Sequence, residues 1–206
     1  MSIILEGLTF GLILAASMGP IFIALTQTSI EKGTLPGLTV GLGIWISDIL
    51  IVALLHTFIH SIKSTIESPS FNFWMGISGA IILFLFGAIL LIKKPSLEYQ
   101  DIKLSRSDYL GFWLKGFLIN TVNPFTFVFW MGVISTYVIG RKVSSGDLWL
   151  LLSTIIIVII VSDTAKVYLA HFLKKWLTTK HINSVANISG IILIIFGIFL
   201  AYKVML

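Results

Sequence analysis

Six long apolar runs constrain this chain more than any other feature of its sequence. Each run has about 20 residues or more, the length that an α-helix needs to cross roughly 30 Å of hydrocarbon. Strands of a membrane β-barrel are much shorter, so the runs favour helices. The predicted spans lie at about residues 4–26, 36–59, 72–92, 112–138, 147–170 and 184–205.

The composition agrees with an all-α integral membrane protein. The chain has 206 residues, of which 57% are hydrophobic and 11% charged, whereas soluble domains carry roughly 25% charged residues. Its mean hydropathy is +1.02. We therefore predict a lipid-embedded chain with no soluble domain, in which residues 1–26 form a retained first span rather than a cleaved leader.

Several function classes are disfavoured. The net charge of +5 comes from cations in short loops, as the positive-inside rule expects, so no nucleic-acid partner is predicted. The absence of cysteine excludes disulfides and thiol redox chemistry. The four histidines do not cluster on one span, and no nucleophile–base pair is visible. We predict no metal site, no cofactor and no enzymatic activity.

Matching interruptions occur in the two halves of the chain. Gly19-Pro20 interrupts the first apolar run and Asn123-Pro124 interrupts the fourth. Asp48 lies in the second run, and Asp163 lies in the fifth. Proline breaks helices, and a carboxylate within the membrane is energetically unfavourable unless it has a function or a partner. The repetition predicts a transporter built from two related halves.

Each half contains three predicted spans. Repeat one covers about 4–92, repeat two covers about 112–205, and a polar loop at about 93–111 separates them. Because three is odd, similar halves must cross the membrane in opposite directions. We therefore predict a single polytopic domain made of two inverted-topology three-helix repeats.

The distribution of Lys and Arg predicts the orientation. Loops after the first, third and fifth spans hold Lys32, Lys93, Lys94, Lys103, Arg106, Lys174, Lys175 and Lys180. Loops on the opposite side hold Lys63, Arg141, Lys142 and Lys203. The bias places both termini outside and the central loop in the cytoplasm.

The buried acids and the helix breaks are the candidate site. Asp48 would carry a proton or bind a substrate ammonium; the alternative is a structural acid bonded to neighbouring polar groups. Asp163 lies one helical turn before Lys166, so the two either neutralise each other or form a pair that opens during transport. Lys166 could also reach toward the cytoplasmic end of its span. The breaks at Pro20 and Asn123 would expose backbone groups to a small solute.

These motifs resemble those of the lysine exporter (LysE/RhtB) family. The residues that carry the resemblance are Gly19-Pro20, Ser29 to Gly33, Gly37-Leu38, Gly41, Gly43, Ser47-Asp48, Asn123-Pro124 and Asp163. It implies an exporter of amino acids or their derivatives in the cytoplasmic (inner) membrane, driven by proton antiport and assembled as a homodimer. It also implies transport roles for Pro20, Asp48, Asn123, Pro124 and Asp163. Phe125 departs from the polar residue expected after Asn-Pro, which leaves the substrate open.

Two other functions remain as alternatives. The first is export of an inorganic cation. Two buried acids without clustered His or Cys provide few ligands for a dehydrated metal ion, which disfavours this alternative. The second is a non-transporting membrane assembly protein, which would not require two acids within its spans.

Overall fold

The computed structural model describes residues 2–16, 19–58, 68–92, 104–176 and 178–205, and within them all regular structure is helical. Lys63, Lys93, Lys94 and Lys103, which contribute to the predicted orientation, lie outside the described residues. Most of the predicted central loop also lies outside them.

Four unbroken helices are long and apolar enough to cross a membrane. They correspond to the second, third, fifth and sixth predicted spans. Their bounds are Thr34–Phe58 for α3, Pro69–Ile92 for α5, Ser145–Phe172 for α8 and Thr179–Met205 for α9. A short 3-10 turn, η2 (Leu173–Lys175), extends α8.

The first and fourth predicted spans are each broken into two helices. The first consists of α1 (Ile3–Ala16) and α2 (Pro20–Lys32), which meet at 67°. The fourth consists of α6 (Arg106–Thr121) and α7 (Pro124–Ile134), followed by a π-helix η1 (Ser135–Gly140), with a bend of 61°. The described chain therefore has four candidate spans, or six if each bent pair is one span.

Proline explains where the second helix of each broken pair begins. Its ring has no N–H and a fixed φ, so it suits the first position of a helix and not its interior. Pro20 begins α2 and Pro124 begins α7.

Two boundaries differ most from the predicted spans, by six residues each. Helix α2 runs past residue 26 to Lys32 and ends at Gly33. The φ of Gly33 is 100°, which residues with a side chain rarely adopt. Helix α6 begins at Arg106 rather than near residue 112, because Ser105 and Asp108 form a reciprocal capping box there.

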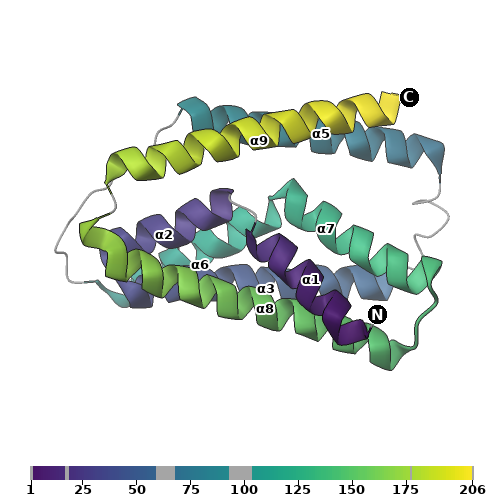
Figure 1. Cartoon of the computed structure of the whole chain (residues 1–206), viewed down its shortest axis with the longest axis horizontal. Coiled ribbons are helices and arrows are strands. Elements are labelled where there is room, and N and C mark those ends of the chain that lie inside the picture. Colours follow the sequence, from purple (N-terminus) through teal and green to yellow (C-terminus); the bar gives the residue numbers. More distant parts are fainter. Residues whose placement is uncertain (1, 17–18, 59–67, 93–103, 177, 206) are drawn as a thin grey trace.

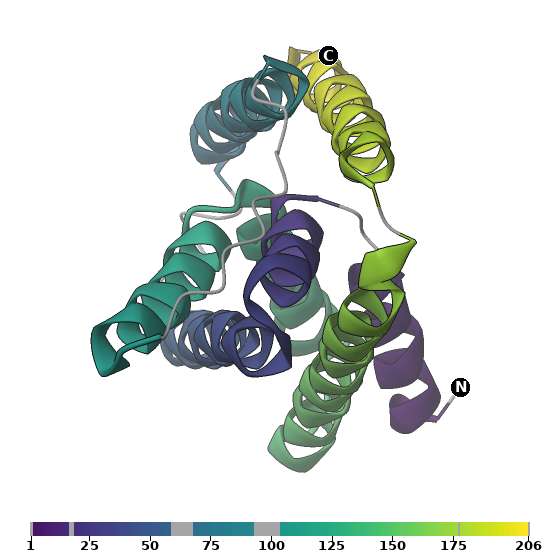
Figure 2. The same cartoon turned by 90° about the vertical axis from the view of Figure 1, so that its left-hand side faces the viewer.

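The helices pack as a main bundle with one separate pair (Figures 1 and 2). In the bundle, α3 lies along α6, α1 lies along α8, and α2 contacts both α3 and α8. Helices α5 and α9 pack chiefly against each other and touch the bundle through α7 and α2. Both termini lie at one end of the molecule, which we call the terminal end; the turn between α2 and α3 lies at the opposite end (Figure 1).

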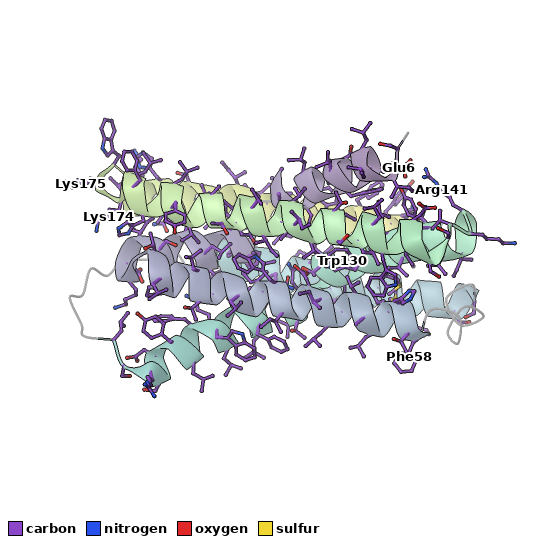
Figure 3. The ribbon with its side chains drawn as sticks, turned by 90° about the horizontal axis from the view of Figure 1, so that it is seen from below. Glu6, Phe58, Trp130, Arg141, Lys174 and Lys175 are labelled. Atoms are coloured by element: carbon purple, nitrogen blue, oxygen red, sulfur yellow. The ribbon has the colours of Figure 1, made fainter. Side chains whose placement is uncertain are left out.

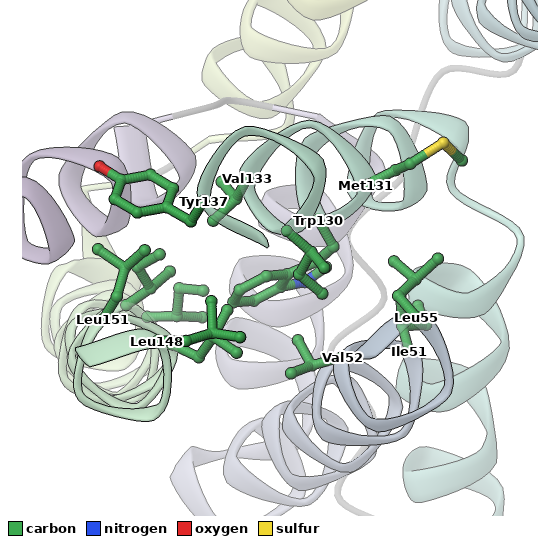
Figure 4. Close-up of a cluster of buried hydrophobic side chains, with 13 residues drawn as sticks. Ile51, Val52, Leu55, Trp130, Met131, Val133, Tyr137, Leu148 and Leu151 are labelled. Atoms are coloured by element: carbon green, nitrogen blue, oxygen red, sulfur yellow. The ribbon is translucent and has the colours of Figure 1, made fainter. Parts of the chain in front are cut away.

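The largest apolar core joins α3, α7, η1 and α8 (Figure 4). Trp130 of α7 is fully buried at its centre, between Val52 of α3 and Leu148 of α8. Elsewhere α3 and α6 approach closely at two glycines. A Cβ on Gly43 would meet the backbone of α6, and one on Gly116 would meet the backbone of α3. The core and this close approach hold α3 between the two halves of the broken fourth span.

Candidate functional site

A small cavity lies where the two helix breaks meet the long helices α3 and α8. Its volume is about 30 Å³, which is room for one or two water molecules. Its polar lining consists of Asp48, Asn120, Asn123, Thr126, Asp163 and Lys166. Its apolar lining consists of Leu14, Ala15, Ile21, Ile44, Phe125 and Ile159. Six helices contribute to this one site, although the residues are far apart in the sequence.

Asp48 on α3 is held by neutral donors. The residue is 3% exposed. The Asn120 amide and the Trp130 indole each donate to Oδ1, both at 2.9 Å. Asn120 precedes the break of the fourth span and Trp130 follows it, so the carboxylate of Asp48 contacts both sides of that break.

Asn120 also bridges the break directly. Its side-chain nitrogen donates to the Ile44 carbonyl at 3.2 Å, and its side-chain oxygen accepts from the Thr126 hydroxyl at 2.9 Å. Asn120 is 1% exposed and Thr126 is also 1% exposed. A buried amide with these partners fixes the relative position of α3, α6 and α7.

Asp163 on α8 has a cationic partner. Lys166 Nζ lies 2.8 Å from Oδ1, and the Trp45 indole donates to Oδ2 at 3.2 Å. The side chains of Asp163 and Lys166 are 3% and 17% exposed. The ammonium of Lys166 therefore sits on Asp163 beside the cavity, rather than extending toward the end of the span.

The two breaks differ at their caps. Asn123 caps α7, because its side-chain oxygen accepts from the Phe125 N–H at 3.1 Å. Gly19, the corresponding residue of α2, supplies no side-chain cap. Neither Gly19 nor Pro20 is among the described residues lining the cavity. The prolines instead begin the helices that bring Ile21, Phe125 and Thr126 to it.

The structure thus brings together four of the seven predicted site residues: Asp48, Asn123, Asp163 and Lys166. It adds four that the sequence argument missed: Trp45, Asn120, Thr126 and Trp130. Spacing could have suggested two of them, since Trp45 lies one turn before Asp48 and Asn120 one turn before Asn123. Among the described residues, no group of three or more His, Cys, Asp or Glu could hold a metal ion.

Comparisons with known proteins agree with the predicted family. A family model described as LysE type translocator matches residues 12–204. A Bacillus subtilis (strain 168) protein named "Putative amino acid efflux protein YcgF" is 25% identical over 207 aligned residues, covering 98% of this chain and 97% of that protein. No solved structure matches. The chain therefore belongs to the LysE type translocator family and is a multi-pass membrane transporter.

Proposed function

We propose that this transporter exports amino acids or their derivatives across the cytoplasmic membrane in exchange for protons. The observation that carries the proposal is the cavity at which two helix breaks and two buried carboxylates meet. Breaks expose backbone polar groups, and carboxylates inside a membrane protein bind cations or protons. The name of the Bacillus subtilis relative supports efflux of amino acids.

The proposed architecture has six spans in two inverted repeats, each bent pair forming one span. The helix contacts support this assignment. In this scheme α1 corresponds to α6, α2 to α7, α3 to α8 and α5 to α9. The contact of α3 with α6 then corresponds to that of α8 with α1, and the contact of α2 with α8 corresponds to that of α7 with α3. The same correspondence relates the α5–α7 contact to the α9–α2 contact. In this scheme the terminal end faces outward, and Lys174 and Lys175 face the cytoplasm at the other end (Figure 3).

The site offers complementary groups for an amino acid. Asp48, whose described hydrogen-bond partners are neutral, would accept the substrate ammonium. Lys166 would exchange part of its contact with Asp163 for the substrate carboxylate, and Asn123 would add a hydrogen bond. Leu14, Ile21 and Phe125 would contact the side chain. A cavity of about 30 Å³ is too small for an amino acid, so loading and release require movement of the half-helices.

Proton coupling follows if the substrate and the proton compete for one carboxylate. An ammonium and a proton each neutralise Asp48, and both cannot do so at once. In the outward-facing conformation the substrate would leave and Asp48 would take up a proton. The transporter would then return to the inward-facing conformation, where Asp48 would release the proton into the cytoplasm. The two Asp48 donors on either side of the break would let this change reach both α6 and α7. No chemical conversion of the solute is required.

Efflux from intact cells tests the proposal. Cells are loaded with a dipeptide mixture, and the loss of each amino acid is followed for wild type, Asp48→Asn, Asp147→Asn and an empty vector. Asp147 is exposed at the start of α8 and remote from the cavity, so Asp147→Asn controls for the loss of a carboxylate as such. We expect rapid loss of particular amino acids in wild type and Asp147→Asn only. Equal efflux from Asp48→Asn would exclude Asp48 as the coupling group. No efflux beyond the vector would exclude an amino-acid exporter.

A further inference from the structure

Glu6 is a buried carboxylate that the proposed transport site does not use. It lies on α1 near the terminal end and is 9% exposed. Its carboxylate accepts hydrogen bonds from the Tyr137 hydroxyl and from Arg141 Nη1, the latter at 2.6 Å. The Arg141 guanidinium also lies over the Tyr137 ring, 4.7 Å from its centroid. Figure 3 shows Glu6 and Arg141 together at this end of the bundle.

These contacts join the two half-helices that lie on the terminal side of the breaks. Glu6 belongs to α1, before the break at Pro20, whereas Tyr137 belongs to η1, after the break at Asn123. A π-helix is rare and is often found at functional sites. Since α1 packs mainly along α8, the polar contacts of Glu6 are a specific connection between α1 and η1.

A continuous stripe on α1 extends from this connection to the cavity. Glu6, Phe10 and Leu14 are spaced by four residues and therefore share one helix face. Phe10 packs edge-on against Phe129 and Tyr137, with ring centroids 6.4 and 6.2 Å apart, and Leu14 lines the cavity. An ion pair, an aromatic layer and an aliphatic side chain thus separate the site from the terminal end.

The opposite end has a weaker connection of the same kind. There α2 and α6 are the half-helices on the far side of the breaks, and Lys115 Nζ of α6 donates to the Thr28 hydroxyl of α2 at 3.1 Å. The described connection at this end is a single hydrogen bond from an exposed lysine, whereas at the terminal end a buried carboxylate accepts from two donors. Between the half-helices themselves, the described polar connection is therefore more extensive at the terminal end.

We propose that Glu6, Tyr137 and Arg141 form the outer gate of the transport path. This inference rests on the exporter proposed above, with the terminal end outside. The gate holds α1 and η1 together while solute enters from the cytoplasm, and it separates to release solute outward. Weakening it shifts the population toward the outward-open conformation, because only the closed conformation makes these contacts.

Cysteine accessibility tests the gate without any transported solute. The chain contains no cysteine, so Ala15→Cys supplies a single thiol at the cavity, where Ala15 is 7% exposed. Intact cells are treated with a membrane-impermeant thiol reagent, and the labelling rate is normalised to total thiol after denaturation. We expect labelling at least tenfold faster when Glu6→Gln or Arg141→Gln is added. Tyr137→Phe, which removes only the hydroxyl, should give a smaller increase and covers the case in which a charge variant fails to insert.

Lys142→Gln is the matched control, because it removes a neighbouring exposed cation at the same end. Labelling in this variant should equal that of Ala15→Cys alone. Unchanged labelling in the Glu6, Arg141 and Tyr137 variants, or equal acceleration by Lys142→Gln, would overturn the gate. Either result would leave the exporter proposal standing, since that depends on efflux. Conversely, a chain that exports no amino acid could still show gated labelling.

Discussion

At the residue scale, the two buried aspartates have different partners and therefore different expected roles. Asp163 has an ammonium at 2.8 Å. Asp48 has an amide and an indole, both neutral. A carboxylate already paired with a cation gains little by binding another, whereas one held only by neutral donors attracts a proton or an ammonium. In the proposed mechanism we therefore assign proton and ammonium exchange to Asp48, whereas the Asp163–Lys166 pair stabilises the cavity wall and offers Lys166 to the substrate carboxylate.

Double substitution of the pair tests this division. Asp163→Asn or Lys166→Met alone leaves a charge without its partner, which costs about 3–5 kcal/mol when the pair is buried. Replacing both removes both charges, so the double variant should recover most of the stability. Thermal unfolding of purified protein in detergent measures the effect, with Asp147→Asn as control. A double variant as unstable as the sum of the single variants would show that the two residues do not act as a pair.

The site could be predicted from the sequence only where a residue is unusual for its surroundings. Asp48 and Asp163 stand out because carboxylates are rare in apolar spans. Asn120 and Trp130 do not, since amides and indoles occur in membrane helices for many reasons. Their importance depends on which carboxylate they reach, and that follows from helix packing. Glu6 likewise does not stand out as a site residue, because nothing in its local sequence reveals the contact with Arg141.

At the element scale, the breaks were predictable but their consequences were not. Proline indicates where a helix is interrupted. It does not specify a bend of 67° or 61°, which depends on what each half-helix packs against. Helix α6 illustrates the same limit, because its polar first turn at Arg106–Tyr109 looks like loop by composition and is helical through its capping box.

Glycine substitutions test the close approach of α3 and α6. In Gly43→Ala, the added methyl group would lie 2.7 Å from the Phe117 nitrogen and still closer to the Trp113 carbonyl oxygen. Because backbone cannot move aside easily, we expect a loss of about 1–3 kcal/mol in unfolding free energy. Gly132→Ala is the matched control: this helical glycine has open space around its Cβ position, and alanine there should stabilise by about 0.5–1 kcal/mol. Equal melting temperatures for the two variants would contradict the close approach of α3 and α6 at Gly43.

At the scale of the whole molecule, the two halves of the proposed repeat architecture differ in chemistry at equivalent positions. Lys166 follows Asp163 by one turn, whereas Ile51 holds the equivalent place after Asp48. Asn120 precedes Pro124 by four residues, and Ala16 precedes Pro20 by the same number. The second half thus supplies most of the polar groups around the cavity, while the first half supplies Asp48, the carboxylate to which we assign exchange.

The assignment of Glu6, Tyr137 and Arg141 as an outer gate depends on which end of the molecule faces outward. Ser145 and Ser107 lie in the first turns of α8 and α6, are exposed, and mark the terminal end and the opposite end. Replacing each serine singly by cysteine leaves the Lys and Arg distribution unchanged, so orientation should not be disturbed. An impermeant thiol reagent should label Ser145→Cys in intact cells, and Ser107→Cys only after permeabilisation. The reverse pattern would place Glu6 and Arg141 at the cytoplasmic end, so that the proposed outer gate would close the side from which an exporter loads.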